Sequence, residues 1–265
     1  MPPLIFPTLT LSDWRETRDT LHKYCRLVGA IREVMSKPLP HALHTNLVLS
    51  KNGFTTSSIT KDDGSADKFF EVVLDVHHRR LRIESNYREP LNIALTGQSL
   101  NALCDETCSL LTDIGIKPPL ERPSFLEGIR GQFDSKQVKI YWKAVSSTKR
   151  VLKKIKAELG KETGPIQLHV DSLTLSLVWY CRDIYSGPLI EQLEMGFSTG
   201  DDRYPEAYFY ISSFPDVRAL KKIIPDESRY LFTQDDSKLI LPYSAITGAK
   251  NSKKKLLDFY RSVIK

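Results

Sequence analysis

The chain has 265 residues, 41% hydrophobic and 26% charged, which is the composition of a globular protein and excludes a disordered or fibrous chain. Its formal net charge of +6 permits an anionic partner without requiring one. No run of about 18 apolar residues occurs, so we expect no membrane span and no membrane partner. The four scattered cysteines do not form a disulfide framework, and they favour a reducing, cytoplasmic location.

The first part of the chain predicts a helix, several antiparallel strands and a second helix. Ser12 is a good N-cap, and apolar residues recur at helical spacing from Trp14 to Met35. Residues 43–50 alternate as a strand does, and the Asn52-Gly53 turn predicts a hairpin. The further predicted elements are strands over 54–60, 69–76, 80–85 and 91–95 and a helix over 99–114.

The second part of the chain repeats this order of elements after a proline-rich segment. We expect a linker over 118–134. The elements predicted after it are a helix over 135–159, strands over 166–179, 207–214, 229–232 and 238–243, and a helix over 252–263. The prediction is an α+β fold with two similar helix–antiparallel-sheet–helix halves, residues 1–117 and 135–265, in a pseudo-twofold arrangement. The two halves can also pack as one compact domain.

A short motif supports an internal repeat. Residues 40–46 read Pro-His-Ala-Leu-His-Thr-Asn, and residues 165–171 read Pro-Ile-Gln-Leu-His-Val-Asp. Each copy is Pro-x-x-Leu-His-x-Asn/Asp and follows a long predicted helix with a tryptophan near its start. The agreement of motif, tryptophan and element order favours a duplication over a chance match.

Several blocks of the sequence resemble one bacterial family. They are Phe6-Pro7-Thr8-Leu9, the stretch from Trp14 to His22, His41-x-x-His44, Gly53 to Ser57, Ala207 to Tyr210, and Leu241-Pro242-Tyr243. In these blocks the chain resembles the family called domain of unknown function 5996, over nearly its full length and most specifically over residues 6–59. The resemblance implies no particular activity, substrate or cofactor.

The sequence also departs from the pattern of that family at two places. Family members carry two tryptophans between the paired histidines, where this chain has Ala42 and Leu43. Their second-half strand carries Trp-Gly-Ser-Phe-Asp, of which little is kept beyond Ser172. A site built on those aromatic residues would be altered or lost here.

Helix residues 14–35 begin with a stripe that is a candidate ligand site. Trp14, Arg18 and His22 are four residues apart, so they share one helix face. A guanidinium can clamp a carboxylate or phosphate, and an indole can form a flat wall beside it. The alternative is that Trp14 belongs to the core and Arg18 pairs with a nearby acid, which could be Asp13, Glu16 or Asp19.

The paired histidines extend this candidate site. His41 and His44 follow a proline-rich turn, and Asn46 shares the His44 face of the expected strand. His169 is the candidate contribution from the second half. His41, His44, His169 and Asp171 are also candidate metal ligands, although the sequence favours no metal. The alternative is that one histidine caps a loop and the other makes a hydrogen bond in the strand.

These residues predict a small-molecule-binding protein whose ligand is anionic or polar, with the pocket in the first half. No nucleophile, P-loop or dinucleotide motif occurs, so whether the protein is an enzyme stays open, and no cofactor or oligomeric state is indicated. One alternative is a non-catalytic module that binds nucleic acid or protein through the lysine-rich helix 149–156; acids nearly balance the lysines, which disfavours nucleic acid. Another is a divergent family member with a decayed site.

Overall fold

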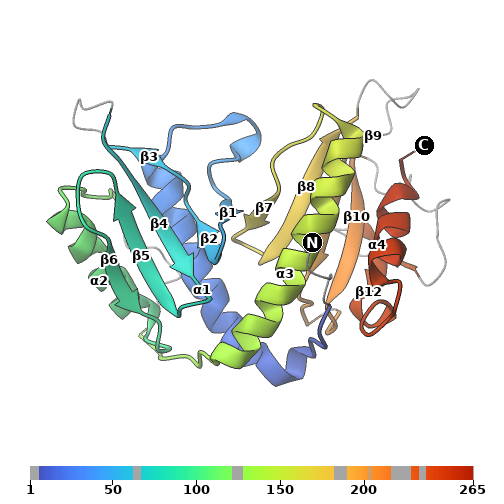
Figure 1. Ribbon diagram of the computed structural model, residues 1–265, viewed down its shortest axis with the longest axis horizontal. Coiled ribbons are helices and arrows are strands. Elements are labelled where there is room, and N and C mark those ends of the chain that lie inside the picture. The colour runs from blue at the N-terminus through green and yellow to red at the C-terminus, as the bar shows by residue number, and fades with distance from the viewer. Residues whose placement is uncertain are drawn as a thin grey trace. The chain divides into compact units, whose positions relative to one another are not determined.

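The computed structural model describes residues 6–61, 67–120, 128–181, 190–202, 204–215, 228–232 and 237–264. Its helices are α1 (Leu11–Met35), α2 (Leu100–Asp113), α3 (Ser135–Leu159) and α4 (Ser252–Arg261), with 3-10 turns η1 (Pro40–Ala42) and η3 (Tyr243–Ala245) (Figure 1). In the described residues no helix has the length and apolar character to cross a membrane. Helices and antiparallel strands are mixed, as an α+β fold requires.

Contacts divide the chain into two compact units. We call residues 14–142 and 168–173 the N-terminal unit. The C-terminal unit comprises the described residues within 1–13, 143–167 and 174–265. The two halves predicted from the sequence, residues 1–117 and 135–265, were defined by a repeated order of elements and not by contacts. That division stays a prediction.

The N-terminal unit is built on an antiparallel sheet of short strands. Its strands are β1 (Leu47–Leu49), β2 (Gly53–Thr55), β3 (Ile59–Thr60), β4 (Phe69–Asp75), β5 (Arg80–Ser85), β6 (Leu91–Ala94) and β7 (Gln167–His169). The order is β7-β1-β2-β4-β5-β6, and β3 pairs with β4. The β1–β2 hairpin has Leu49 opposite Phe54, and the β4–β5 hairpin has Asp75 opposite Arg80. Figure 1 shows α1 running behind these strands and α2 beside β6.

Helix α1 supplies much of the core of this unit. Leu21, Val28 and Ile31 are fully buried, and Tyr24 stacks on Phe133 with 5.8 Å between ring centroids. Burying an aliphatic side chain of this size contributes about 1.5–3 kcal/mol relative to leaving it exposed. The helical spacing read from the sequence is therefore the spacing of the buried face.

The start of α3 is joined to α1 by a defined contact. The hydroxyl of Thr17 accepts a hydrogen bond from the backbone N–H of Asp134 at 3.1 Å. The Asp134 carboxylate in turn accepts the N–H of Lys136 at 2.7 Å, which caps the first turn of α3. The capping residue therefore stands at the position where the sequence predicts the helix to begin.

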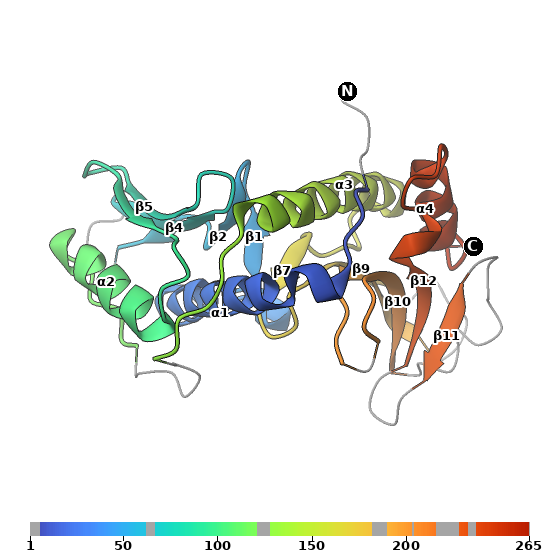
Figure 2. The ribbon, with the colours of Figure 1, turned by 90° about the horizontal axis from the view of Figure 1, so that it is seen from below.

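The C-terminal unit also contains antiparallel strands. Its strands are β8 (Thr174–Tyr180), β9 (Ile190–Ser198), β10 (Tyr208–Pro215), β11 (Arg229–Phe232) and β12 (Ser237–Pro242), in the order β11-β12-β10-β9-β8. Figures 1 and 2 show α4 beside β10 and β12. The hydroxyl of Tyr260 on α4 donates to the carbonyl of Gly196 on β9 at 2.8 Å, so α4 packs on these strands.

Two predicted strands are shorter than the sequence indicates. The strand predicted over 43–50 is only β1, because η1 and a turn occupy residues 40–46. The backbone turns there, since His41 and Ala42 have positive φ angles and Thr45 N–H bonds to the carbonyl of Ala42 at 3.0 Å. The strand predicted over 166–179 is interrupted between β7 and β8 by a turn that places Leu173 at φ 52°.

Strand β9 is absent from the predicted elements. Its residues Leu193, Met195 and Phe197 alternate, and all three are fully buried between β8 and β10. The alternation was therefore present in the sequence. The intervening Gln192, Glu194 and Gly196 make the segment look too polar and too flexible for a central strand.

Candidate functional site

Trp14 and Arg18 already have partners within the protein. Trp14 is only 2% exposed and stacks on Tyr141 at 4.9 Å between ring centroids, so it belongs to the core of the N-terminal unit. The Arg18 guanidinium makes an ion pair with Asp19 at 2.7 Å. These contacts agree with the alternative stated from the sequence, in which Trp14 is a core residue and Arg18 pairs with a nearby acid.

His22 contacts a segment that lies 148 residues away in the chain. Its Nε2 is 2.7 Å from the carbonyl of Val170, and both residues belong to the N-terminal unit. Burial lowers the pKa of the imidazole below its ordinary value of 6.5, although the bond to Val170 acts in the opposite direction. A neutral imidazole that donates through Nε2 explains this geometry. The bond joins His22 to Val170, which stands between His169 and Asp171 in the chain.

The histidine pair sits in the turn before β1. The backbone N–H of Leu39 donates to Nδ1 of His44 at 3.2 Å, and His41 is exposed with a left-handed backbone. The carbonyl of Asn46 accepts a hydrogen bond from the guanidinium of Arg32 on α1. The His44 ring therefore stabilises the turn, and the Asn46 carbonyl joins the turn to α1 through Arg32.

The candidate metal ligands do not form a metal site in the described residues. Across these residues no three His, Cys, Asp or Glu side chains are grouped as a metal ion requires. Within the described residues, no set of three potential ligands includes any of His41, His44, His169 and Asp171.

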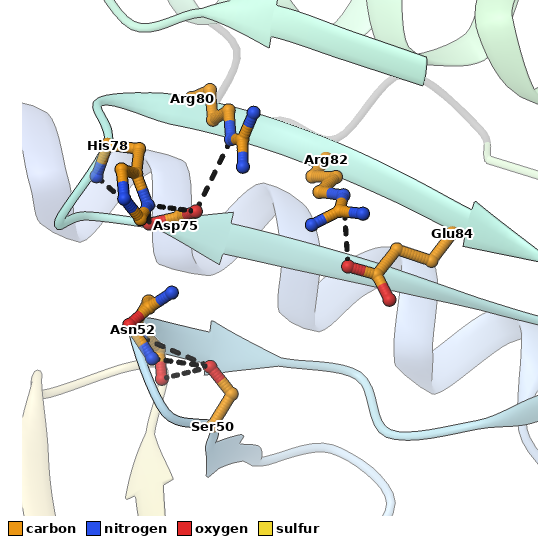
Figure 3. Close-up of polar contacts among 8 residues, drawn as sticks. Ser50, Asn52, Asp75, His78, Arg80, Arg82 and Glu84 are labelled. Carbon is orange, nitrogen blue, oxygen red and sulfur yellow. Dashed lines mark hydrogen bonds and ion pairs between the residues drawn. The ribbon is translucent and has the colours of Figure 1, made fainter. Parts of the chain in front are cut away.

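A polar cluster that the sequence did not single out lies at the turn between β4 and β5 (Figure 3). The carboxylate of Asp75 is 4% exposed and accepts the backbone N–H of His78 at 3.0 Å. It also contacts Nδ1 of the His78 ring at 2.8 Å and Nε of Arg80 at 3.3 Å. Burial would raise the pKa of the Asp75 carboxyl, but the bonds from His78 and Arg80 outweigh burial and lower it below 3.8.

The neighbouring hairpin contacts this cluster through its backbone. The carbonyl of Asn52 accepts the N–H of His77 at 3.2 Å, and the Ser50 hydroxyl accepts the N–H of Gly53 at 3.1 Å. Figure 3 shows the Ser50–Asn52 turn beside the end of β4, while the Asp75 carboxylate points toward His78 and Arg80. An Asp–His pair of this kind can orient an imidazole for proton transfer. In this protein the contacts of Asp75 and His78 hold the β4–β5 turn, which bonds to the β1–β2 turn through His77 and Asn52, and this structural role accounts for the pair.

The C-terminal unit contains a cavity of about 410 Å³. Three threonines and a serine line it, Thr8, Thr10, Thr247 and Ser244. Tyr243 and Glu206 also line it, and Leu9, Leu11 and Pro205 form its apolar part. This volume is in the range of small-molecule sites, about 300–1,000 Å³.

The walls of the cavity are held by defined contacts. Phe6 packs edge-on against Phe209 at 5.7 Å and Tyr243 at 6.1 Å between ring centroids, which anchors the segment that carries Thr8 and Thr10. Glu206 accepts the N–H of Ser244 at 3.2 Å, and Tyr243 N–H bonds to the carbonyl of Ala207 at 2.9 Å. Burial raises the pKa of the Tyr243 hydroxyl well above its ordinary value, so Tyr243 stays a neutral phenol.

The sequence did not predict this cavity as a site. Its lining residues are mostly threonine, serine and leucine, which are common in all structure, and they come from distant segments of the chain. Only their assembly at the start of α1 and at η3 makes them a concave site.

A comparison with protein families finds a match over residues 6–265 to the family described as "Family of unknown function (DUF5996)". The chain belongs to this family. No curated protein and no solved structure matches the chain. The resemblance stated from the sequence is thereby confirmed for nearly the full length.

Proposed function

We propose that this family member binds a small polar ligand in the cavity of the C-terminal unit. The observation that supports this proposal is the 410 Å³ volume with mixed hydroxyl, carboxylate and apolar lining. Apolar walls with a few fixed polar groups are the usual construction of a ligand site, because the walls supply burial and the polar groups supply orientation.

The pocket expected around Trp14, Arg18, His22, His41, His44, Asn46 and His169 stays a prediction. The contacts of Trp14 with Tyr141, Arg18 with Asp19 and His22 with Val170 support a packing role more than a ligand role. We therefore keep small-molecule binding, the function expected from the sequence, and propose the cavity of the C-terminal unit as its site.

Thermal unfolding in the presence of small compounds tests the proposal. The compounds are sugars, polyols, amines, amino acids and carboxylic acids, each assayed with the wild type and with Thr247→Trp, which fills the cavity. A ligand that binds the cavity raises the Tm of the wild type and not that of Thr247→Trp. Lys254→Ala, an exposed change on α4, is the matched control and keeps the shift. A shift that survives Thr247→Trp and disappears in Arg18→Gln would instead support the pocket on α1.

A second candidate function uses the lysine-rich part of α3 to bind nucleic acid or protein. The specific support is the ion pair between Arg261 and Glu158 at 2.6 Å, which joins the end of α4 to the end of α3, while α4 also carries the exposed Lys253 and Lys254. Part of the lysine-rich stretch is engaged within the protein, since Lys156 donates to the carbonyl of Gly164 at 2.5 Å. Gel-shift titrations with duplex DNA and RNA over a salt series test this function, because phosphate-driven binding falls steeply as salt rises.

We also infer that the two halves arose by duplication. In support, α1 and α3 both have 25 residues, and each is followed by β-strands and then by α2 or α4. The local motif is less alike in structure than in sequence, because His44 lies in a turn and His169 ends β7. The test is superposition of residues 12–115 on 135–264 in an experimental structure, and the pseudo-twofold arrangement remains a prediction until then.

A cytoplasmic location is proposed on the state of the cysteines. Cys25, Cys104, Cys108 and Cys181 are not joined in disulfides, as expected in a reducing compartment. Cell fractionation with an antibody to the protein tests the location, and recovery outside the cytoplasm would contradict it.

A further inference from the structure

We infer that the cavity of the C-terminal unit selects a cationic or neutral hydroxyl-bearing ligand and rejects an anionic one. This inference rests on the ligand-binding function proposed above and adds the chemical class of the ligand. It replaces the anionic ligand that Arg18 and the histidines suggested from the sequence with one that fits the residues lining the cavity.

The charge of the lining supports this selection. Among the described residues that line the cavity, Glu206 is the acidic one and none is Lys, Arg or His. A glutamate carboxylate carries a full negative charge at neutral pH. An anionic ligand group entering this space would meet that charge without a cationic side chain to offset it, whereas an ammonium group would form a charge-assisted hydrogen bond.

The start of α1 is the one opposing contribution from the backbone. Leu11 lines the cavity and begins the helix, whose N-terminal end carries the equivalent of roughly half a positive charge. Asp13 lies in the same first turn and offsets part of that charge. Half a charge, partly offset, is smaller than the full charge of Glu206, so the balance in the cavity is negative.

The position of the Glu206 carboxylate is fixed by its surroundings. One carboxylate oxygen accepts the N–H of Ser244 at 3.2 Å, and a carboxylate has about four acceptor sites in all, so it can accept further bonds from a ligand. The backbone of Glu206 is also closely packed. An ideal Cβ on Gly200 would lie 2.6 Å from the Glu206 carbonyl oxygen, and Gly200 has φ +84°. The backbone of Glu206, which lines the cavity, is therefore held against Gly200.

The hydroxyl groups of the lining indicate that the ligand carries hydroxyls of its own. Thr8, Thr10 and Ser244 each carry a hydroxyl that can donate and accept hydrogen bonds, and the Thr247 hydroxyl, which donates to the carbonyl of Tyr243 at 3.0 Å, can still accept one.

Three probes of equal size and different charge test the selection. They are 2-amino-1,3-propanediol, glycerol and glycerate, which are cationic, neutral and anionic three-carbon molecules. Titration of each into the ¹⁵N-labelled full-length protein is followed by the amide signals of Ser244 and Thr247. We expect the amine to bind about threefold to tenfold more tightly than glycerol, and glycerate to bind most weakly.

A pair of matched variants assigns the preference to Glu206. Glu206→Gln removes the charge and keeps the acceptor oxygen for the Ser244 N–H, so the amine and glycerol should then bind within about twofold of each other. Glu158→Gln removes a charge from the same unit outside the cavity and should keep the preference. Glycerate binding as tightly as the amine, or a preference unchanged in Glu206→Gln, would overturn the inference and leave the proposed function standing. Failure of all three probes to shift the cavity amides would overturn both.

Discussion

Gly29 is the glycine inside α1, and replacing it with alanine sets two effects of known size against each other. At an open helix position the change stabilises a protein by about 0.8–1.0 kcal/mol, because glycine is the poorer helix former. Here an ideal Cβ on Gly29 would lie 2.7 Å from Cγ1 of Val170. Overpacking of this kind costs about 1–3 kcal/mol. We therefore expect Gly29→Ala to lower the free energy of unfolding by up to about 2 kcal/mol.

Urea unfolding of the single and double variants measures this balance. Val170→Ala removes the two Cγ atoms that a Cβ on Gly29 would meet and leaves only the Val170 Cβ position at 3.2 Å, so Gly29→Ala should stabilise the Val170→Ala protein by up to about 1 kcal/mol. Ala30→Gly is the control at the neighbouring helix position, and its cost should be the same in both backgrounds. A Gly29→Ala protein about 1 kcal/mol more stable than the wild type would refute the close approach of residues 168–173 to α1.

Three further predictions concern titration and thiol chemistry. Because burial lowers the pKa of His22, the unfolded chain binds a proton below pH 6.5 more readily than the folded protein, so stability should fall as pH drops through that value. His22→Gln should remove this part of the slope in urea midpoints measured between pH 5.5 and 7.5. The pKa of Asp75 is held below 3.8, so its contribution is present above pH 3.8 and lost as pH falls further; Asp75→Asn should flatten the acid limb of the same curve. Ellman's reagent should label at most Cys108 in the native protein and all four cysteines in guanidinium, because the other three are buried; rapid native labelling of several would contradict their burial.

The long helices and the tight hairpins were predictable because their signals are local. Helix α3 occupies residues 135–159 as predicted, and the Asn52-Gly53 turn joins β1 to β2. Residues 43–46 belong to a turn and not to the predicted strand, because the alternation of apolar residues continues through the turn. The left-handed backbone at His41 and the bond from the Leu39 N–H to the His44 ring leave no mark in that alternation.

The candidate site was less predictable than the fold. Histidine, arginine and tryptophan attract attention because they can do chemistry, yet Trp14 and His22 are used for packing and for a bond to Val170. Asp75 was passed over as one acid in a strand, although the fold surrounds it with His78 and Arg80. Such roles depend on which residues become neighbours across the sheet.

Two segments that resemble the family, one near each end of the chain, also contribute residues to the cavity of the C-terminal unit. Phe6-Pro7-Thr8-Leu9 and Leu241-Pro242-Tyr243 carry the resemblance, and Thr8, Leu9 and Tyr243 line the cavity. Packing alone accounts for Phe6 and Tyr243, whose rings contact each other at 6.1 Å between centroids.

Packing does not account for Thr8, which is exposed and offers a hydroxyl to the cavity. Thr8→Val keeps the shape of the side chain, so stability should change by no more than about 0.5 kcal/mol, as at other exposed sites. If the cavity binds a hydroxyl-bearing ligand, the same variant should weaken glycerol binding severalfold in the amide titration. Loss of stability with unchanged glycerol binding would mean that this end of the chain serves the aromatic core and not a ligand.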